Sequence, residues 1–183
     1  MYKLKPGDAG KTSRYKARIV VKGFQQKKGV DFDEIFVPVV MMTSIRTVLS
    51  IAASMNLEVE QLDVKTAFLH GDLEEEIYMQ HPEGFVEKRK EHLVFRLKKS
   101  LYGLKQAPRQ WYRKFDSFMT DHRYNKTQLD HCVLVKNFDR GDFLILLLYI
   151  DNILIVGRDP KKIGCLKKAL RKSFAMKDMG STK

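Results

Sequence analysis

The hydrophobic pattern of the chain is strongest in residues 143–157, where two apolar runs flank the polar break Tyr149-Ile150-Asp151-Asn152. Neither run approaches the roughly 20 apolar residues that a membrane-spanning helix needs. Both runs have strand length and are rich in leucine, isoleucine and valine, so we predict a buried β-hairpin that turns at the break. Turn chemistry alone can account for Asp151. A functional carboxylate at the tip of so apolar a hairpin is the alternative, and the pattern leaves both open.

The rest of the pattern predicts a mixture of helices and strands, which indicates an α+β domain. We expect strands over residues 15–21, 58–64, 74–79, 94–97 and 132–135, and helices from Thr43 or Ser44 to about Met55, over 107–122, and over 161–174 after a cap at Asp159. The helix faces expected to be buried carry Ile45, Val48, Leu49 and Ala52, then Trp111, Phe115, Phe118 and Met119, then Ile163, Leu166, Leu170 and Phe174. Residues 1–13 are expected to form a loop, and no closing element is expected near the C-terminal end.

The charge of the chain indicates which class of partner it binds. The 183 residues include 34 Lys and Arg against 22 Asp and Glu, which gives a formal net charge of +12. Basic residues concentrate in 1–28 and 161–183, and such an excess favours nucleic acid over an acidic membrane surface. Cys132 and Cys165 lack CxxC spacing and are expected to be reduced thiols. With no signal peptide or lipidation motif visible, we expect an intracellular protein, cytoplasmic or nuclear and not secreted, that does not enter a membrane.

Two aspartates associated with strands are the best candidates for chemistry. Asp63 lies at the end of the 58–64 strand and Asp151 at the hairpin tip. Two carboxylates about 4 Å apart repel by about 4 kcal/mol at an effective dielectric near 20, so they stay ionised together only around a cation. Mg²⁺ suits such a pair, and two such ions can catalyse phosphoryl transfer. An aspartate that closes a strand is also a common turn starter, so both interpretations of Asp63 remain open.

Two further groups of charged residues have a functional and a structural interpretation. Lys16 and Arg18 are two apart on an expected strand and therefore share a face. They can bind a triphosphate or a nucleic-acid backbone, or they can keep an edge strand soluble. The acidic residues of 31–34 have no histidine or fourth ligand nearby, so we interpret them as surface residues. No GxxxxGK[ST] motif is present, so a nucleotide would be bound by metal and cations.

Four motifs together resemble the copia-type LTR retrotransposon reverse transcriptases, which are part of a Pol polyprotein. They are RYKARIVVKGF (14–24), QLDVKTAFLHGDLEEEIYMQHPEGF (61–85), KKSLYGLKQAPRQWYRKFDSF (98–118) and LLLYIDNILIVG (146–157). The resemblance runs through essentially the whole chain, with the motifs in the same order and spacing. It implies one reverse transcriptase domain fragment over 1–183, with fingers-like segments at about 1–57 and 70–98. The segments at about 58–69 and 99–180 would form a palm whose antiparallel sheet is backed by the second and third helices.

The resemblance also implies roles for individual residues. Asp63 and Asp151 would be catalytic, metal-binding aspartates, with Val64 lending a backbone carbonyl to the metal. The stretch YIDN at 149–152 matches the family's YxDD hairpin. Phe68 would close the sugar pocket against a 2′-hydroxyl. The remaining residues implied in nucleotide binding are Lys16, Arg18, Tyr102, Gly103 and Gln106.

The sequence departs from the family pattern at the second aspartate of YxDD, where Asn152 stands. An amide oxygen can accept a contact but carries no charge, so we expect a weakened site. A thumb is also expected to be absent, as in a truncated copy. The implied function is RNA-directed DNA polymerisation with Mg²⁺ or Mn²⁺, a primed RNA or DNA template and deoxynucleoside triphosphates. The alternative is a non-catalytic nucleic-acid-binding remnant of a decayed retroelement.

Overall fold

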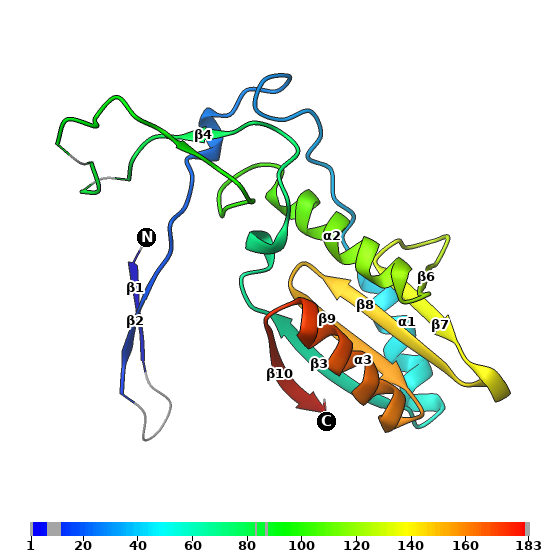
Figure 1. Cartoon of the computed structure of the whole chain (residues 1–183). Helices are drawn as coiled ribbons and strands as arrows, with labels where there is room; N and C mark the ends of the chain where they lie inside the picture. Colours follow the sequence, from blue (N-terminus) through cyan, green and yellow to red (C-terminus); the bar gives the residue numbers. More distant parts are fainter. Residues whose placement is uncertain (1, 7–11, 83, 87, 182–183) are drawn as a thin grey trace.

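The computed structural model describes residues 2–6, 12–82, 84–86 and 88–181, which form an α+β fold (Figure 1). Within these residues lie three α-helices, α1 (Met42–Ser54), α2 (Ala107–Asp121) and α3 (Pro160–Ser173). Short 3₁₀ turns occupy η1 (Gly23–Gln25), η2 (Ala67–His70) and η3 (Asp139–Gly141). The ladders between named strands are antiparallel in all three sheets of the described chain. The expected α+β class with antiparallel sheets is confirmed.

The largest sheet of the described chain has six strands in the order β10-β3-β9-β8-β7-β6. Their bounds are β3 (Glu58–Val64), β6 (Asn125–Lys126), β7 (Val133–Asn137), β8 (Phe143–Tyr149), β9 (Asn152–Gly157) and β10 (Met176–Ser181). The predicted hairpin is confirmed as β8 and β9. Tyr149 pairs with Asn152, so the connection is a two-residue loop of Ile150 and Asp151. The predicted strand over 58–64 is confirmed at both ends.

Helices α2 and α3 cover one face of this sheet (Figure 1). The side chains that they bury include Trp111, Phe115, Met119, Ile163, Leu166 and Leu170, as the helical spacing predicts. Fully burying an apolar side chain of this size contributes about 1.5–3 kcal/mol, so this layer supplies much of the stability. The cap of α3 is also confirmed, since Asp159 Oδ1 accepts a hydrogen bond of 2.8 Å from the Lys161 amide.

Helix α1 packs on the opposite face of the sheet, against residues of β7, β8 and β9. Val48 and Ala52 are buried as predicted, but Leu49 is 41% exposed at the edge of this contact. The predicted cap at Thr43 or Ser44 is wrong, because the helix begins at Met42 and the cap position is Met41. The buried carboxylate of Asp130 accepts a 2.9 Å hydrogen bond from the Met41 amide instead. A residue far along the chain thus does what a local cap does in other helices.

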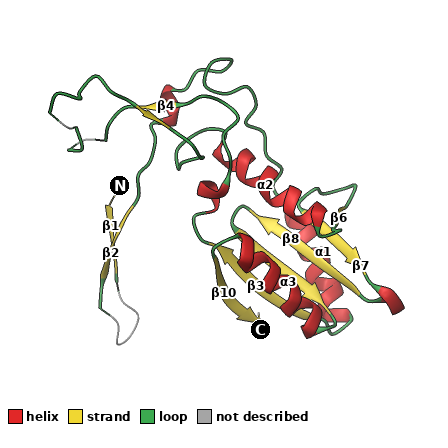
Figure 2. Cartoon of the chain, in the orientation of Figure 1, coloured by secondary structure: helices red, strands yellow, loops and turns green. Residues whose placement is uncertain are grey.

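The short strands of the two small sheets differ from the prediction. The expected N-terminal loop contains β1 (Tyr2–Lys5), which pairs with β2 (Arg14–Ala17) in a hairpin shown apart from the large sheet in Figure 2. The strand expected over 15–21 is shorter than predicted, because β2 ends at Ala17 and Arg18 lies outside it. The strands expected over 74–79 and 94–97 shrink to β4 (Tyr78–Met79) and β5 (Phe95–Arg96), which pair with each other.

The expectation of no closing element is also wrong, because β10 follows α3 and pairs with β3. Its sequence MKDMGS is mostly exposed, which is common for an edge strand, and its two methionines form no apolar pattern that a sequence analysis could detect. Both cysteines are free, Cys132 buried and Cys165 exposed. No helix in the described part of the chain is long and apolar enough to cross a membrane.

Candidate active site

Asp63 on β3 and Asp151 in the β8–β9 loop lie at the same end of the large sheet. The Val64 amide donates a 2.7 Å hydrogen bond to the Asp151 carbonyl, which joins the end of β3 to the hairpin loop. The preceding pair, Asp63 and Asn152, therefore belongs to the type without mutual backbone bonds, in which Cα atoms lie about 4.5 Å apart and side chains are closest. Two residues that are far apart in the sequence are thus neighbours in space.

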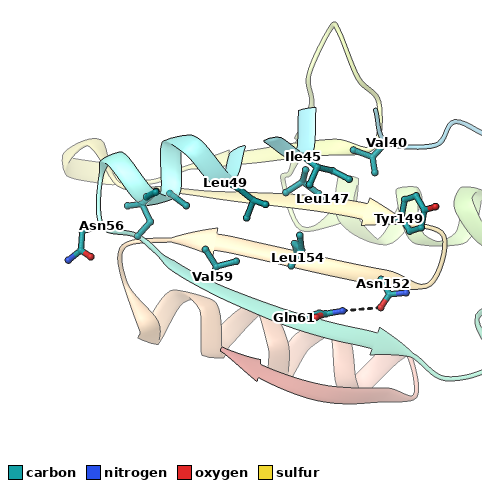
Figure 3. Close-up of a pocket in the computed structure, with 13 residues that line it drawn as sticks. Val40, Ile45, Leu49, Asn56, Val59, Gln61, Leu147, Tyr149, Asn152 and Leu154 are labelled. Atoms are coloured by element: carbon teal, nitrogen blue, oxygen red, sulfur yellow. Dashed lines mark hydrogen bonds between the residues drawn. The ribbon is translucent and has the colours of Figure 1, made fainter. Parts of the chain in front are cut away.

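Asn152 is the neighbour of both aspartates, of Asp63 across the strand pair and of Asp151 along the chain. It lies directly opposite Asp63, so both side chains project from the same face of the sheet. Its Nδ2 donates a 3.0 Å hydrogen bond to Oδ1 of Asp151. Its Oδ1 accepts a 3.1 Å hydrogen bond from Nε2 of Gln61, as the dashed line in Figure 3 shows. The Gln61 bond orients the Asn152 amide so that its N–H groups face Asp151.

Sequence reasoning missed Gln61, although a signal was present. Gln61 precedes Asp63 by two residues in a strand and so must share its face. It also missed Lys177, which lies directly opposite Asp63 on β10 and places a cation on the same face. This neighbour was undetectable because β10 itself was not predicted.

The face that carries Asp63 and Asn152 is open at this end, in contrast to the covered α2–α3 face. Beside them, between α1 and the strands, lies a groove of about 650 Å³ (Figure 3). Its apolar walls include Leu49 and Leu154, and its polar end is formed by Gln61, Tyr149 and Asn152. A ligand can therefore approach the sheet end from the α1 side.

Phe68 and Tyr102 are brought together near this end of the sheet. After β3 the chain turns through Thr66, whose φ of 55° lies in the left-handed region, into η2, which carries Phe68. The ring centroids of Phe68 and Tyr102 are 5.4 Å apart. The Arg18 guanidinium lies 5.4 Å from the centre of the Tyr102 ring, a distance typical of a cation–π contact. These three candidate nucleotide-binding residues thus form a contiguous group.

Lys16 belongs to the β1–β2 hairpin, where it pairs directly with Lys3. Arg14 shares the face of Lys16 because it lies two residues away in the same strand. Like charges placed opposite each other destabilise a strand pair, and an anion bound between them would remove that cost. The hairpin therefore carries a face on which cations gather.

Gly103 and Gln106 are structural contacts as well as candidate binding residues. Gly103 has φ +95°, and a Cβ there would lie 2.1 Å from the Val21 carbonyl oxygen, so the backbone approach requires glycine. The Val21 amide donates to the Tyr102 carbonyl at 2.7 Å. Gln106 is completely buried, accepts from Gln26 and donates to the Asp31 carbonyl. These bonds attach the N-terminal segment to the start of α2.

The sequence model of the family described as "Reverse transcriptase (RNA-dependent DNA polymerase)" matches residues 1–183. The chain belongs to this reverse transcriptase family. Among its relatives, the Retrovirus-related Pol polyprotein from transposon TNT 1-94 of Nicotiana tabacum is 67% identical over 180 residues. The corresponding polyproteins from transposons RE1 and RE2 of Arabidopsis thaliana are 41% and 42% identical over 170 residues.

The chain spans only a small part of these relatives. The aligned region covers 98% of this chain but 14% of the tobacco polyprotein, and 92% of this chain but 12% of each Arabidopsis polyprotein. No solved structure matches the chain. The resemblance to copia-type reverse transcriptases is therefore confirmed at the level of this domain.

The end of the large sheet that carries Asp63 and Asp151 was expected to bind a metal ion. Among the described residues, no group of three or more His, Cys, Asp or Glu side chains is placed to hold a metal ion. Asp63 and Asp151 are both partly exposed, and Asn152 pairs with Asp63 and donates a hydrogen bond to Asp151. Two carboxylates with solvent access match the way Mg²⁺ is usually bound, by one or two carboxylates together with water and substrate phosphates.

Proposed function

We propose that the chain is the catalytic part of an RNA-directed DNA polymerase that transfers a nucleotidyl group to a primer 3′-hydroxyl. The observation that carries this proposal is the meeting of Asp63 and Asp151 at one sheet end, held by the 2.7 Å bond between the Val64 amide and the Asp151 carbonyl. Membership of the reverse transcriptase family supports it.

Asp63 and Asp151, together with the Val64 carbonyl, would hold Mg²⁺ or Mn²⁺. When bound, such ions supply activation of the attacking oxygen and neutralisation of phosphate charge. The chain's own contribution is electrostatic: two carboxylates, one on β3 and one in the neighbouring hairpin loop, repel each other unless a cation or a proton is shared between them. The hydrogen bond from Asn152 compensates part of the negative charge on Asp151, which weakens the attraction for a cation compared with a third carboxylate.

The nucleotide would be oriented by the group around Tyr102. Phe68 would limit space at the sugar, and Arg18, positioned over the Tyr102 ring, would face the triphosphate. Lys16 on the cationic hairpin would contribute to phosphate binding. In this proposal the large sheet with α2 and α3 corresponds to the palm, and the β1–β2 and β4–β5 hairpins correspond to parts of the fingers.

A primed RNA or DNA template would follow the basic surface of the chain. The net charge of +12 favours binding to phosphates through counterion release, which makes affinity fall steeply as salt rises. Replacing cations of the β1–β2 hairpin, such as Lys3, is expected to weaken binding for all sequences alike. The slope of the logarithm of affinity against the logarithm of salt concentration should become shallower by about one for each phosphate that the variant no longer neutralises.

Primer extension by the purified chain with Mg²⁺ or Mn²⁺ tests the proposal. The wild type is compared with Asn152→Asp, with Asp63→Asn and Asp151→Asn, and with Asp121→Asn as a matched control on the exposed end of α2. We expect extension by the wild type, more by Asn152→Asp, and loss of at least 100-fold, on the order of a missing catalytic group, in the two active-site variants. No extension by either the wild type or Asn152→Asp would overturn the proposed activity.

A second candidate function is nucleic-acid binding without catalysis. It is favoured by Asn152, which leaves the site one carboxylate short of the family pattern. In that case a labelled template–primer binds with the same affinity to the wild type and to the Asp63→Ala and Asp151→Ala variants, with and without Mg²⁺. A polymerase site predicts instead that Mg²⁺ increases deoxynucleotide binding in the wild type and not in these variants.

A further inference from the structure

The hairpin loop that carries Asp151 has a strained conformation. The register of β8 and β9 leaves Ile150 and Asp151 as the two loop residues, and Ile150 has a φ of 58°. In a two-residue hairpin loop this position favours glycine, and a β-branched residue with positive φ is an outlier that persists only when its surroundings hold it. The structure must therefore contain contacts that hold this loop.

Two hydrogen bonds of 2.7 Å do so, one to each loop carbonyl. The Trp111 indole Nε1–H donates to the Ile150 carbonyl, and the Val64 amide donates to the Asp151 carbonyl. The first bond ties the loop to α2 and the second ties it to the strand that carries Asp63. The loop is thus fixed from the helix layer below the sheet and from the neighbouring strand.

Trp111 is suited to hold the loop because its side chain is buried in the core. Its side chain is 2% exposed and packs against Phe115 and Phe174, whose ring centroids lie 5.6 and 5.2 Å away. It also lines, together with Phe68 and Ile150, one small crevice below the loop. A buried indole N–H needs a hydrogen-bond partner. For Trp111 this partner is the carbonyl of Ile150, the strained residue next to Asp151.

We propose that Trp111 is a positioning residue for Asp151: its indole N–H holds the strained loop and thereby keeps the Asp151 carboxylate beside Asp63. The role of Asp151 as a metal ligand rests on the proposed function, whereas the hold on the loop does not. Trp111 contacts neither substrate nor metal in this proposal. It acts only through the Ile150 carbonyl.

The test compares Trp111→Phe with Met119→Ala in the whole 183-residue chain. Phenylalanine keeps an aromatic ring in the core but lacks the N–H. Met119 is a fully buried core residue of the same helix, eight residues and therefore about 12 Å further along its axis, so its truncation loosens the core away from the loop. The two readouts are hydrogen exchange of the Val64 amide, which reports the loop, and the Mn²⁺ dissociation constant.

In Trp111→Phe we expect the Val64 amide to exchange about tenfold faster relative to mid-strand amides of β3, and Mn²⁺ to bind about tenfold more weakly, as for one missing hydrogen bond. In Met119→Ala all β3 amides should change together and Mn²⁺ affinity should stay within about twofold. Trp111→Phe behaving like Met119→Ala would overturn the proposal. If the wild type binds no Mn²⁺, the metal site of the proposed function fails, and the exchange measurement alone decides whether Trp111 holds the loop.

Discussion

Replacing Asn152 by aspartate introduces a carboxylate where the structure has an amide donor. Nδ2 of Asn152 lies 3.0 Å from Oδ1 of Asp151, and Asp63 is directly opposite on the neighbouring strand. The variant loses the hydrogen bond and places like charges side by side. Two unit charges 3.0 Å apart repel by about 5–6 kcal/mol at an effective dielectric of 20 and by about 1.4 kcal/mol in water.

The measured cost should lie near the lower of these values. Asp151 and Asn152 are both partly exposed, so the new carboxylate can rotate towards solvent and water screens the pair. We expect the metal-free Asn152→Asp variant to have a free energy of unfolding about 1–2 kcal/mol below that of the wild type at pH 7. Repulsion between carboxylates favours retention of a proton in the folded state, so the difference should shrink as the pH falls towards about 4.

Magnesium should reverse the effect, because a cation between carboxylates turns repulsion into binding free energy. A ligand at about 100 times its dissociation constant stabilises the native state by about 2.7 kcal/mol. Urea unfolding at pH 4 and pH 7, with and without Mg²⁺, measures the free energy of unfolding under each of these four conditions. Asn152→Ala is the control, since it removes both amide hydrogen bonds and adds no charge. An Asn152→Asp variant as stable as the wild type at pH 7 without Mg²⁺, or one indifferent to Mg²⁺, would refute the reasoning.

Three further outcomes follow from the fold. Burial raises the pKa of Cys132 to about 12 while Cys165 is exposed, so a thiol reagent at pH 8 should label one cysteine in the native chain, Cys165, by mass spectrometry. Burial acts to raise the pKa of Asp130, but hydrogen bonds including that from the Met41 amide hold the pKa below its ordinary value. Asp130→Asn should therefore lower the free energy of unfolding by about 1–3 kcal/mol in urea at pH 7. A stability difference between variant and wild type that persists unchanged below pH 3 would contradict this origin. Gly103→Ala should cost about 1–3 kcal/mol, since its φ is positive and a Cβ would meet a carbonyl, and limited proteolysis should then cleave residues 14–24 faster than in the wild type.

How much of the molecule a sequence analysis can predict differs between its elements. The β8–β9 hairpin was predictable because it consists of two continuous apolar runs of strand length, and β3 because Val59, Leu62 and Val64 suggest a strand. The inner faces of α2 and α3 were predictable because their apolar residues recur at helical spacing. Strand β10 was not, because an exposed edge strand needs no apolar residues on its outer side. The start of α1 was missed because no local side chain caps it, and the amide of its cap residue, Met41, is bound by Asp130.

The candidate site divides in the same way. Residue types, order and spacing identified Asp63 and Asp151 through their resemblance to a family motif, and local turn chemistry marked the hairpin tip. The contacts that give the site its geometry join residues far apart in the chain: Gln61 with Asn152, and Trp111 with Ile150. Such contacts depend on strand register and on how a helix packs beneath the loop, and neither leaves a periodic trace in the sequence.

The sequence alone therefore determined the buried elements, namely β3, the β8–β9 hairpin and the inner faces of α2 and α3, since these depend on short-range apolar patterns. Only the tertiary structure decided that Asp63 faces Asn152 and Lys177, because register is set by the pairing of whole strands. It also decided that a buried tryptophan holds the loop of Asp151, because that bond exists only after the helix layer has packed against the sheet.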